Sequence, residues 1–147
     1  MNEKPLKLTD MAGIEEMIIE LISKYPSLPF KASSKTISWQ GLGTSDGIGL
    51  ITLSGAVYIK QYISGGFTAQ MPFRIEYQTK PTTTKARLDA QKFVEDLSIW
   101  LEQCDATFKK NIDLNKIERD TPVIKNRAYT DGSEVYSCTM NIKYSKN

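Results

Sequence analysis

The stretch Phe67-Thr-Ala-Gln-Met-Pro-Phe-Arg-Ile-Glu-Tyr77 decides the fold. Its apolar residues occupy every second position, and polar residues or Pro72 fill the positions between them. This period of two over eleven residues predicts a β-strand with one buried and one solvent-facing side. Because Pro72 lacks an amide hydrogen, we expect the strand either to lie at a sheet edge there or to carry a β-bulge.

Further strands are predicted on both sides of this stretch. Residues 57–63 alternate in the same way, and Ser64-Gly65-Gly66 predicts a hairpin turn between the two strands. Residues 136–144 also alternate, directly after a turn signal at 130–133. Shorter strands are expected at 36–39, 48–53, 115–120 and 123–129.

Two segments show the helical period instead. Apolar residues recur at three- and four-residue steps over 9–24, where Thr9 or Asp10 is the expected N-cap. The second predicted helix covers 82–103, with a threonine as its cap. Its expected buried stripe comprises Ala86, Ala90, Phe93, Leu97, Trp100, Leu101 and Cys104.

The order helix, strands, helix, strands, with tight hairpins, predicts an α+β fold. We expect a mainly antiparallel sheet with two amphipathic helices packed on one face. The sequence has neither an internal repeat nor a linker, so residues 1–147 are expected to form a single domain.

Composition excludes several kinds of chemistry. The chain has 147 residues and no histidine, so no mechanism that needs imidazole is available. Two cysteines cannot complete a zinc site without histidine. Cys104 and Cys138 could meet in the core, but the favoured interpretation is two small buried side chains in a reducing compartment. We therefore expect no catalytic residues, no cofactor and no metal, and the protein is not expected to be an enzyme.

Charge is distributed unevenly, although the net charge is only +2. Residues 9–22 contain four acidic and no basic residues, and residues 24–80 contain six basic and two acidic ones. The helical layer is thus predicted to be acidic and the strand layer basic, which would allow unlike faces of two copies to pair. Solvated faces without a partner are the alternative. Neither a leader peptide nor a membrane span is expected, which predicts a soluble protein made in a cytoplasm.

The glycine-rich segment 40–49 is the first candidate interface. Gly41-x-Gly43-x-x-x-Gly47 lacks the lysine–threonine pair of a phosphate loop, and no predicted helix follows it. A loop that becomes ordered against a neighbouring protein fits better, with Gly41, Gly43, Asp46 and Gly47 as its interface residues.

The second candidate lies within residues 109–127, which contain six basic and three acidic residues. This excess is small for a nucleic-acid site, so a protein interface or a solvated surface is favoured. The candidate interface residues are Lys116, Arg119, Lys125 and Arg127.

The order of motifs resembles a known family. Gly65-Gly66, then Met71-Pro-Phe-Arg-Ile-Glu-Tyr77, then Arg87-Leu-Asp-Ala90, then Phe93 through Leu97 to Trp100-Leu101, and finally the alternating strand from Val135 to Tyr144, are similar to the minor capsid or tail terminator proteins of tailed bacteriophages. The resemblance covers about residues 56–145 and indicates a phage of Gram-positive bacteria or a phage-like particle.

This resemblance implies a structural role in the virion neck. Tail terminators form rings, usually hexamers, on the head-proximal end of the tail tube. Virion assembly takes place in the host cytoplasm. They end tube polymerisation and provide the docking surface for the head–tail connector. The implied partners are further copies of the chain, the tail tube protein and the connector, with DNA passing only transiently through the lumen and no membrane.

Two alternatives remain open. The first is a head-completion or head–tail joining protein of the same neck region. The second is a small-ligand-binding module, which would need a deep, partly polar pocket with convergent groups.

Overall fold

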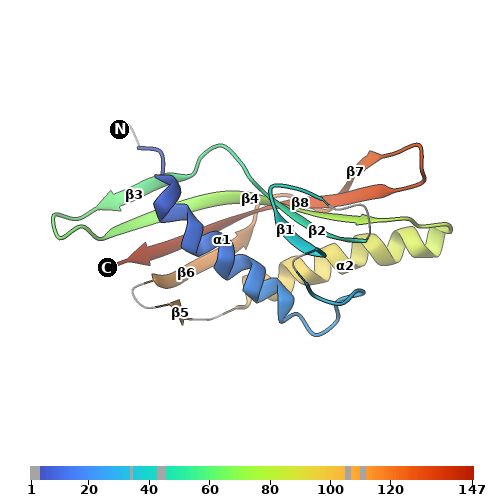
Figure 1. Cartoon of the computed structure of the whole chain (residues 1–147), viewed down its shortest axis with the longest axis horizontal. Coiled ribbons are helices and arrows are strands. Elements are labelled where there is room, and N and C mark those ends of the chain that lie inside the picture. The colour runs from blue at the N-terminus through green and yellow to red at the C-terminus, as the bar shows by residue number, and fades with distance from the viewer. Residues whose placement is uncertain (1–3, 34, 43–45, 105–106, 110–111) are drawn as a thin grey trace.

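The computed structural model describes residues 4–33, 35–42, 46–104, 107–109 and 112–147. Figure 1 shows an elongated sheet built on two long strands, with the helices packed along it. The helices are α1 (Leu8–Ser23) and α2 (Thr84–Glu102). The strands are β1 (Ile37–Trp39), β2 (Gly47–Thr52), β3 (Val57–Gln61), β4 (Phe67–Thr79), β5 (Thr107–Lys109), β6 (Ile112–Arg119), β7 (Ile124–Ala128) and β8 (Glu134–Lys146).

The two long strands form the centre of the sheet. β4 and β8 are antiparallel and pair at all 13 positions, from Phe67 opposite Lys146 to Thr79 opposite Glu134. On the outer edge of β4 lie β2 and β3, and on the outer edge of β8 lie β6 and β7. β5 pairs with β6, and β1 pairs with β2 in the sheet's one parallel register within the described chain.

Pro72 lies at a local edge of the sheet, as the first of the two expectations has it. β2 pairs with β4 from Phe73 onward and β3 pairs up to Gln70, so neither strand covers Pro72. The Pro72 carbonyl still accepts a hydrogen bond from the Leu53 amide, at 3.0 Å. The Pro72 nitrogen therefore points into the gap between β2 and β3, where no strand offers a carbonyl that would need an amide hydrogen.

The predicted α+β fold, with a mostly antiparallel sheet and both helices on one face, is confirmed. Alternate residues of β8 contact the two helices: the Tyr144 hydroxyl donates to the Asp10 carbonyl of α1, at 2.8 Å, and Glu134 accepts a hydrogen bond from Arg87 of α2, at 3.0 Å. The alternating apolar side chains of β4 and β8 form the floor of one core beneath the helices.

The helix predictions need small corrections. Thr83 caps α2 as expected, accepting a hydrogen bond from the Ala86 amide at 3.0 Å. Neither Thr9 nor Asp10 caps α1, because that helix begins one residue earlier and the Asp10 carboxylate bonds Tyr58 of β3 instead. Val94 is fully buried although it was not assigned to the buried stripe, whereas Ala86, Phe93, Trp100 and Cys104 are only half-buried.

Aromatic rings join the end of α1, the following loop, β4 and α2. The ring centroids of Tyr77 and Phe93 are 4.8 Å apart, and those of Tyr25 and Trp100 are 5.4 Å apart. Edge-to-face pairs of this kind add stability beyond the area they bury. Phe30 stacks on Tyr77 with ring centroids 6.3 Å apart, which holds the 26–30 segment against the C-terminal end of β4.

We predict that Phe73→Ala destabilises the protein by about 3–5 kcal/mol, because it leaves a cavity at the fully buried centre of β4. The measurement is urea unfolding followed by circular dichroism. Ile63→Ala is the control, since Ile63 is fully exposed, and it should change the unfolding free energy by less than about 0.5 kcal/mol. Equal effects of the two substitutions would contradict the assigned core.

Candidate interaction surfaces

The glycine-rich segment is divided between a loop and a strand. Gly47 and Gly49, expected in a flexible loop, lie in β2, which corrects the boundary of that loop. The reason is close packing: a Cβ on Gly49 would lie 2.5 Å from the Gly41 carbonyl oxygen, and one on Gly47 would lie 2.7 Å from the Thr36 oxygen. These glycines allow neighbouring backbone to cross the strand closely.

The other predicted residues of this segment have different surroundings. The Gly41 carbonyl accepts a hydrogen bond from the Ser38 hydroxyl at 2.8 Å, and a Cβ on Gly41 would meet no atom within 4 Å. Asp46 is exposed and accepts a hydrogen bond from the Thr79 hydroxyl at 3.1 Å, which places it at the far end of β4. Gly43 lies outside the described residues.

The four predicted basic residues do not form one patch. Lys116 pairs in register with Lys143, on the sheet face away from the helices, and Arg127 lies on the same face. Arg119 and Lys125 lie on the helix face, opposite Met140 and Tyr136. Lys116 and Arg119 are three residues apart, so regular alternation places them on opposite faces, whereas Lys125 and Arg127 are two apart and are separated by the bulge between them.

Each of these four bases also has an acidic partner within the chain. Lys116 lies 3.1 Å from Glu118, Arg119 lies 3.8 Å from Glu95, and Lys125 lies 3.8 Å from Glu134. Arg127 lies 2.9 Å from Glu76. Their role at an interface stays a prediction, and it would require them to exchange or share these partners.

Glu76 is the centre of a polar cluster on the sheet face away from the helices. Its carboxylate is almost fully buried and accepts hydrogen bonds from Arg127, at 2.9 Å, and Asn126, at 3.0 Å. Arg74 lies 3.2 Å away. A buried carboxylate needs such partners because an unpaired buried charge is costly. Because Asn126 and Arg127 belong to β7 and Glu76 to β4, the cluster holds the β7–β8 hairpin against β4.

Glu134 is the centre of a matching cluster on the helix face. It accepts hydrogen bonds from Arg87 of α2, at 3.0 Å, and from the Tyr136 hydroxyl, at 2.9 Å. Burial alone would raise the pKa of Glu134, but the hydrogen bonds from Arg87 and Tyr136, with the charges of Arg87 and Lys125, outweigh burial and lower that pKa. Burial and Glu134 together raise the pKa of Tyr136 to about 12.

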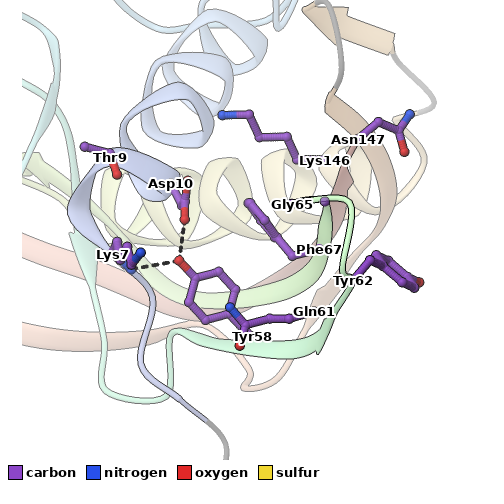
Figure 2. A pocket seen from close by; sticks show the side chains of 11 residues that line it. Lys7, Thr9, Asp10, Tyr58, Gln61, Tyr62, Gly65, Phe67, Lys146 and Asn147 are labelled. Atoms are coloured by element: carbon purple, nitrogen blue, oxygen red, sulfur yellow. Dashed lines mark hydrogen bonds between the residues drawn. The ribbon is translucent and has the colours of Figure 1, made fainter.

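The β3–β4 hairpin forms the opposite end of the molecule and encloses a hollow of about 410 Å³ with the start of α1 (Figure 2). Tyr58, which lines the hollow, donates a hydrogen bond to the Asp10 carboxylate. Lys7, Lys146 and Tyr62 also line the hollow. Near the turn, Ile59, Tyr62 and Ile63 are exposed to solvent.

A second hollow, of about 270 Å³, lies at the far end of β4. Its walls are mainly apolar and include Pro29, Tyr77, Ala86, Ala90 and Phe93, together with the charged residues Lys80 and Asp89. Neither hollow was predicted. Tyr62 and Ile63, at the end of the predicted 57–63 strand and directly before the predicted turn, were the available sequence signal for the first, whereas the second depends on the packing of three distant segments.

The two cysteines are free thiols, Cys104 half-buried and Cys138 buried. Burial raises the pKa of both, that of Cys138 to about 11. Within the described residues, no cluster of three or more acidic or cysteine side chains could hold a metal ion. In the same part of the chain, neither helix is long and apolar enough to cross a bilayer.

Comparison with known proteins gives a likeness of fold. No family model and no curated protein matches the sequence. Among solved structures, a chain from the virion of a native gene transfer agent (GTA) particle has a similar fold, with a TM-score of 0.51 and 11% sequence identity. The match covers 75% of this chain and 78% of that chain. At this identity the match shows a shared fold.

We predict that Gly49→Ala destabilises the protein by about 1–3 kcal/mol, because its Cβ would overlap the Gly41 carbonyl oxygen. Gly41→Ala is the matched control and should change the unfolding free energy by less than about 0.5 kcal/mol, since its Cβ meets open space. Urea unfolding measures both. If Gly49→Ala were neutral, the close crossing of residues 40–42 over β2 would be wrong.

A second prediction concerns acid stability. Because the pKa of Glu134 is lower in the folded protein than its ordinary value of 4.5, the stabilisation by its charge is complete above pH 4.5 and is lost as the pH falls through the folded value. The wild-type chain should therefore exceed Glu134→Gln in unfolding free energy at neutral pH. This excess should shrink below pH 4.5, as measured by urea unfolding at a series of pH values; a gap that widens in acid would contradict the assignment.

Proposed function

We propose that this protein is a structural component of a phage or phage-like particle, located in the tail or neck of the virion. The observation that carries the proposal is the fold shared with a GTA virion chain over three quarters of both chains. The order of motifs from Gly65-Gly66 to Tyr144, which resembles the tail terminator family, gives independent support.

Within that class, we propose the role of tail terminator. Copies of the chain form a ring, a hexamer by the family resemblance, on the head-proximal end of the tail tube. The ring ends tube polymerisation and offers a surface to the head–tail connector, while DNA passes through its lumen. In this role the protein acts through shape and surface charge, and catalyses no reaction.

The charge distribution supports assembly from unlike surfaces. α1 contains the acidic residues Asp10, Glu15, Glu16 and Glu20 and no basic residue. β7 contains two basic and no acidic residues, and β8 contains two lysines and one glutamate; Lys125, Arg127 and Lys143 form ion pairs within the chain and would share them with a partner. A ring needs a head-to-tail contact between two different surfaces, and opposite charge helps to fix its register.

We predict that particles produced without this protein have tails of irregular, excessive length that lack heads. Negative-stain electron microscopy of particles from a deletion strain measures tail length and head attachment, and supplying the intact gene in trans should restore both. Tails of normal length without heads would assign the head–tail joining role instead. Normal particles would contradict both roles.

The free chain is expected to be monomeric or weakly associated and to close into a ring on the tube. Native mass spectrometry of the purified chain, alone and with tube protein, checks this expectation. A monomer that persists in the presence of assembled tubes would contradict the terminator role.

A further inference from the structure

The β3–β4 hairpin presents apolar side chains at an end of the molecule where the fold gives them nothing to pack against. Ile59 and Tyr62 are about half exposed and Ile63 is fully exposed. They fall within five consecutive residues, whereas the other large exposed apolar residues in the described chain are scattered over α1, α2 and the β7 region. Clustered exposed apolar groups indicate a surface that another protein covers.

The apolar hollow at the far end of β4 is a receptor of suitable size on the same chain. An apolar cavity of ~150 Å³ already holds a benzene ring. The hollow of about 270 Å³ therefore has room for one isoleucine or tyrosine side chain between Pro29 and Phe93. Ala86 and Ala90 leave its α2 wall open.

The hairpin and the hollow lie at opposite ends of one strand. β4 starts at Phe67, directly after the hairpin turn, and ends at Thr79, which lines the hollow. Thirteen residues at ~3.3 Å each separate the two by about 40 Å. One chain therefore cannot fill its own hollow, and contact between the two must join different copies head to tail.

The charges at the two ends are complementary. Lys4, Lys7, Lys60 and Lys146 lie at the hairpin end, and within the described chain none of them has an ion pair. Lys60 instead lies over the ring of Tyr62, with its nitrogen 5.5 Å from the ring centroid. Asp10 is the acidic side chain that lines the hollow between the β3–β4 hairpin and α1, and it accepts a hydrogen bond from Tyr58.

Aspartates exceed lysines around the other hollow. Asp89 lies at its rim, Asp46 lies beside Thr79, and Asp131 lies 3.5 Å from Lys80. Lys80 pairs with Asp131 and Lys85 pairs with Asp89, so an incoming lysine would share these aspartates with them. The surroundings of this hollow therefore have an excess of one negative charge, which complements the lysines at the hairpin end.

We propose that the β3–β4 hairpin of one copy inserts into the hollow beside α2 of the next copy, with Ile63 in the hollow and Lys60 facing Asp89. This inference rests on the proposed ring and names the contact that builds it. It also places the predicted interface residues Asp46 and Gly47 next to the incoming hairpin.

Trapping by disulfide formation tests the contact in the purified chain. Ile63→Cys and Ala86→Cys are made separately, each in a Cys104→Ser background, and the two proteins are mixed under mild oxidation. A disulfide needs its two Cα atoms within about 7 Å, so the mixed dimer should form at least about tenfold more than with Ile124→Cys in place of Ile63→Cys. Ile124 is a matched control because it is also an exposed isoleucine, on β7.

Charge exchange tests the register of the same contact. Adding Lys60→Glu to the Ile63→Cys protein should reduce the mixed dimer several-fold, and adding Asp89→Lys to the Ala86→Cys protein should restore it. Lys92→Glu, at another exposed lysine, should have no effect. A yield no higher than that of the Ile124→Cys control, or a loss that the paired exchange does not restore, would overturn the proposed contact.

The same assay with tube protein present distinguishes a contact between two copies of the chain from a contact between the hairpin and the tube protein. If Ile63→Cys links to tube protein and not to Ala86→Cys, the hairpin is a tube contact and the proposal is wrong. This assay measures a contact between purified chains, whereas the deletion experiment measures tail length. The hairpin contact can therefore be wrong while the terminator role is right, and the terminator role can be wrong while the contact is right.

Discussion

The rest of the structure depends on the uninterrupted pairing of β4 with β8. Two 13-residue strands in full register form a ribbon to which each remaining part of the sheet attaches, directly or through one intermediate strand. The alternation of apolar and polar side chains fixes that register, because a slip by one residue would turn Phe73, Met140 and their neighbours out of the core. The helices then have one continuous apolar floor to cover.

The ribbon is longer than any strand that flanks it, and this mismatch shapes both of its edges. β2 and β3 share one edge and leave a gap at Pro72, while β6 and β7 share the other. Near the β7–β8 hairpin, Glu76 and Glu134 lie on opposite faces: Arg127 of β7 pairs with Glu76, and Arg87 of α2 and Lys125 of β7 pair with Glu134. These two carboxylates fasten the hairpin from both sides, which apolar packing at a narrow edge would do less specifically.

The sequence predicts the elements of this fold better than its surfaces. Periodicity identifies both helices and the long strands, because the core imposes it residue by residue along β4 and α2. It does not identify the role of Gly49, since close packing against residue 41 depends on a crossing that only the folded chain creates. The same holds for the basic residues: Lys125 and Arg127 are two apart and would share a face in a regular strand, but the bulge between them places them on opposite faces. Composition predicts how many basic residues a segment contains, whereas ion pairs within the folded chain decide how many of them are available to a partner.

An elongated ribbon with different chemistry at its two ends has a consequence for assembly. Where unlike ends of identical chains meet, each contact adds the same rotation, and the assembly either closes into a ring or continues as a helix. A stiff connection between the two contact regions makes that rotation a property of the fold, because β4 runs unbroken from the hairpin to the hollow. Small changes in the twist of the ribbon would then alter the number of copies per turn. In the proposed ring, the full register of β4 and β8 would therefore determine the number of copies as well as the stability of each copy.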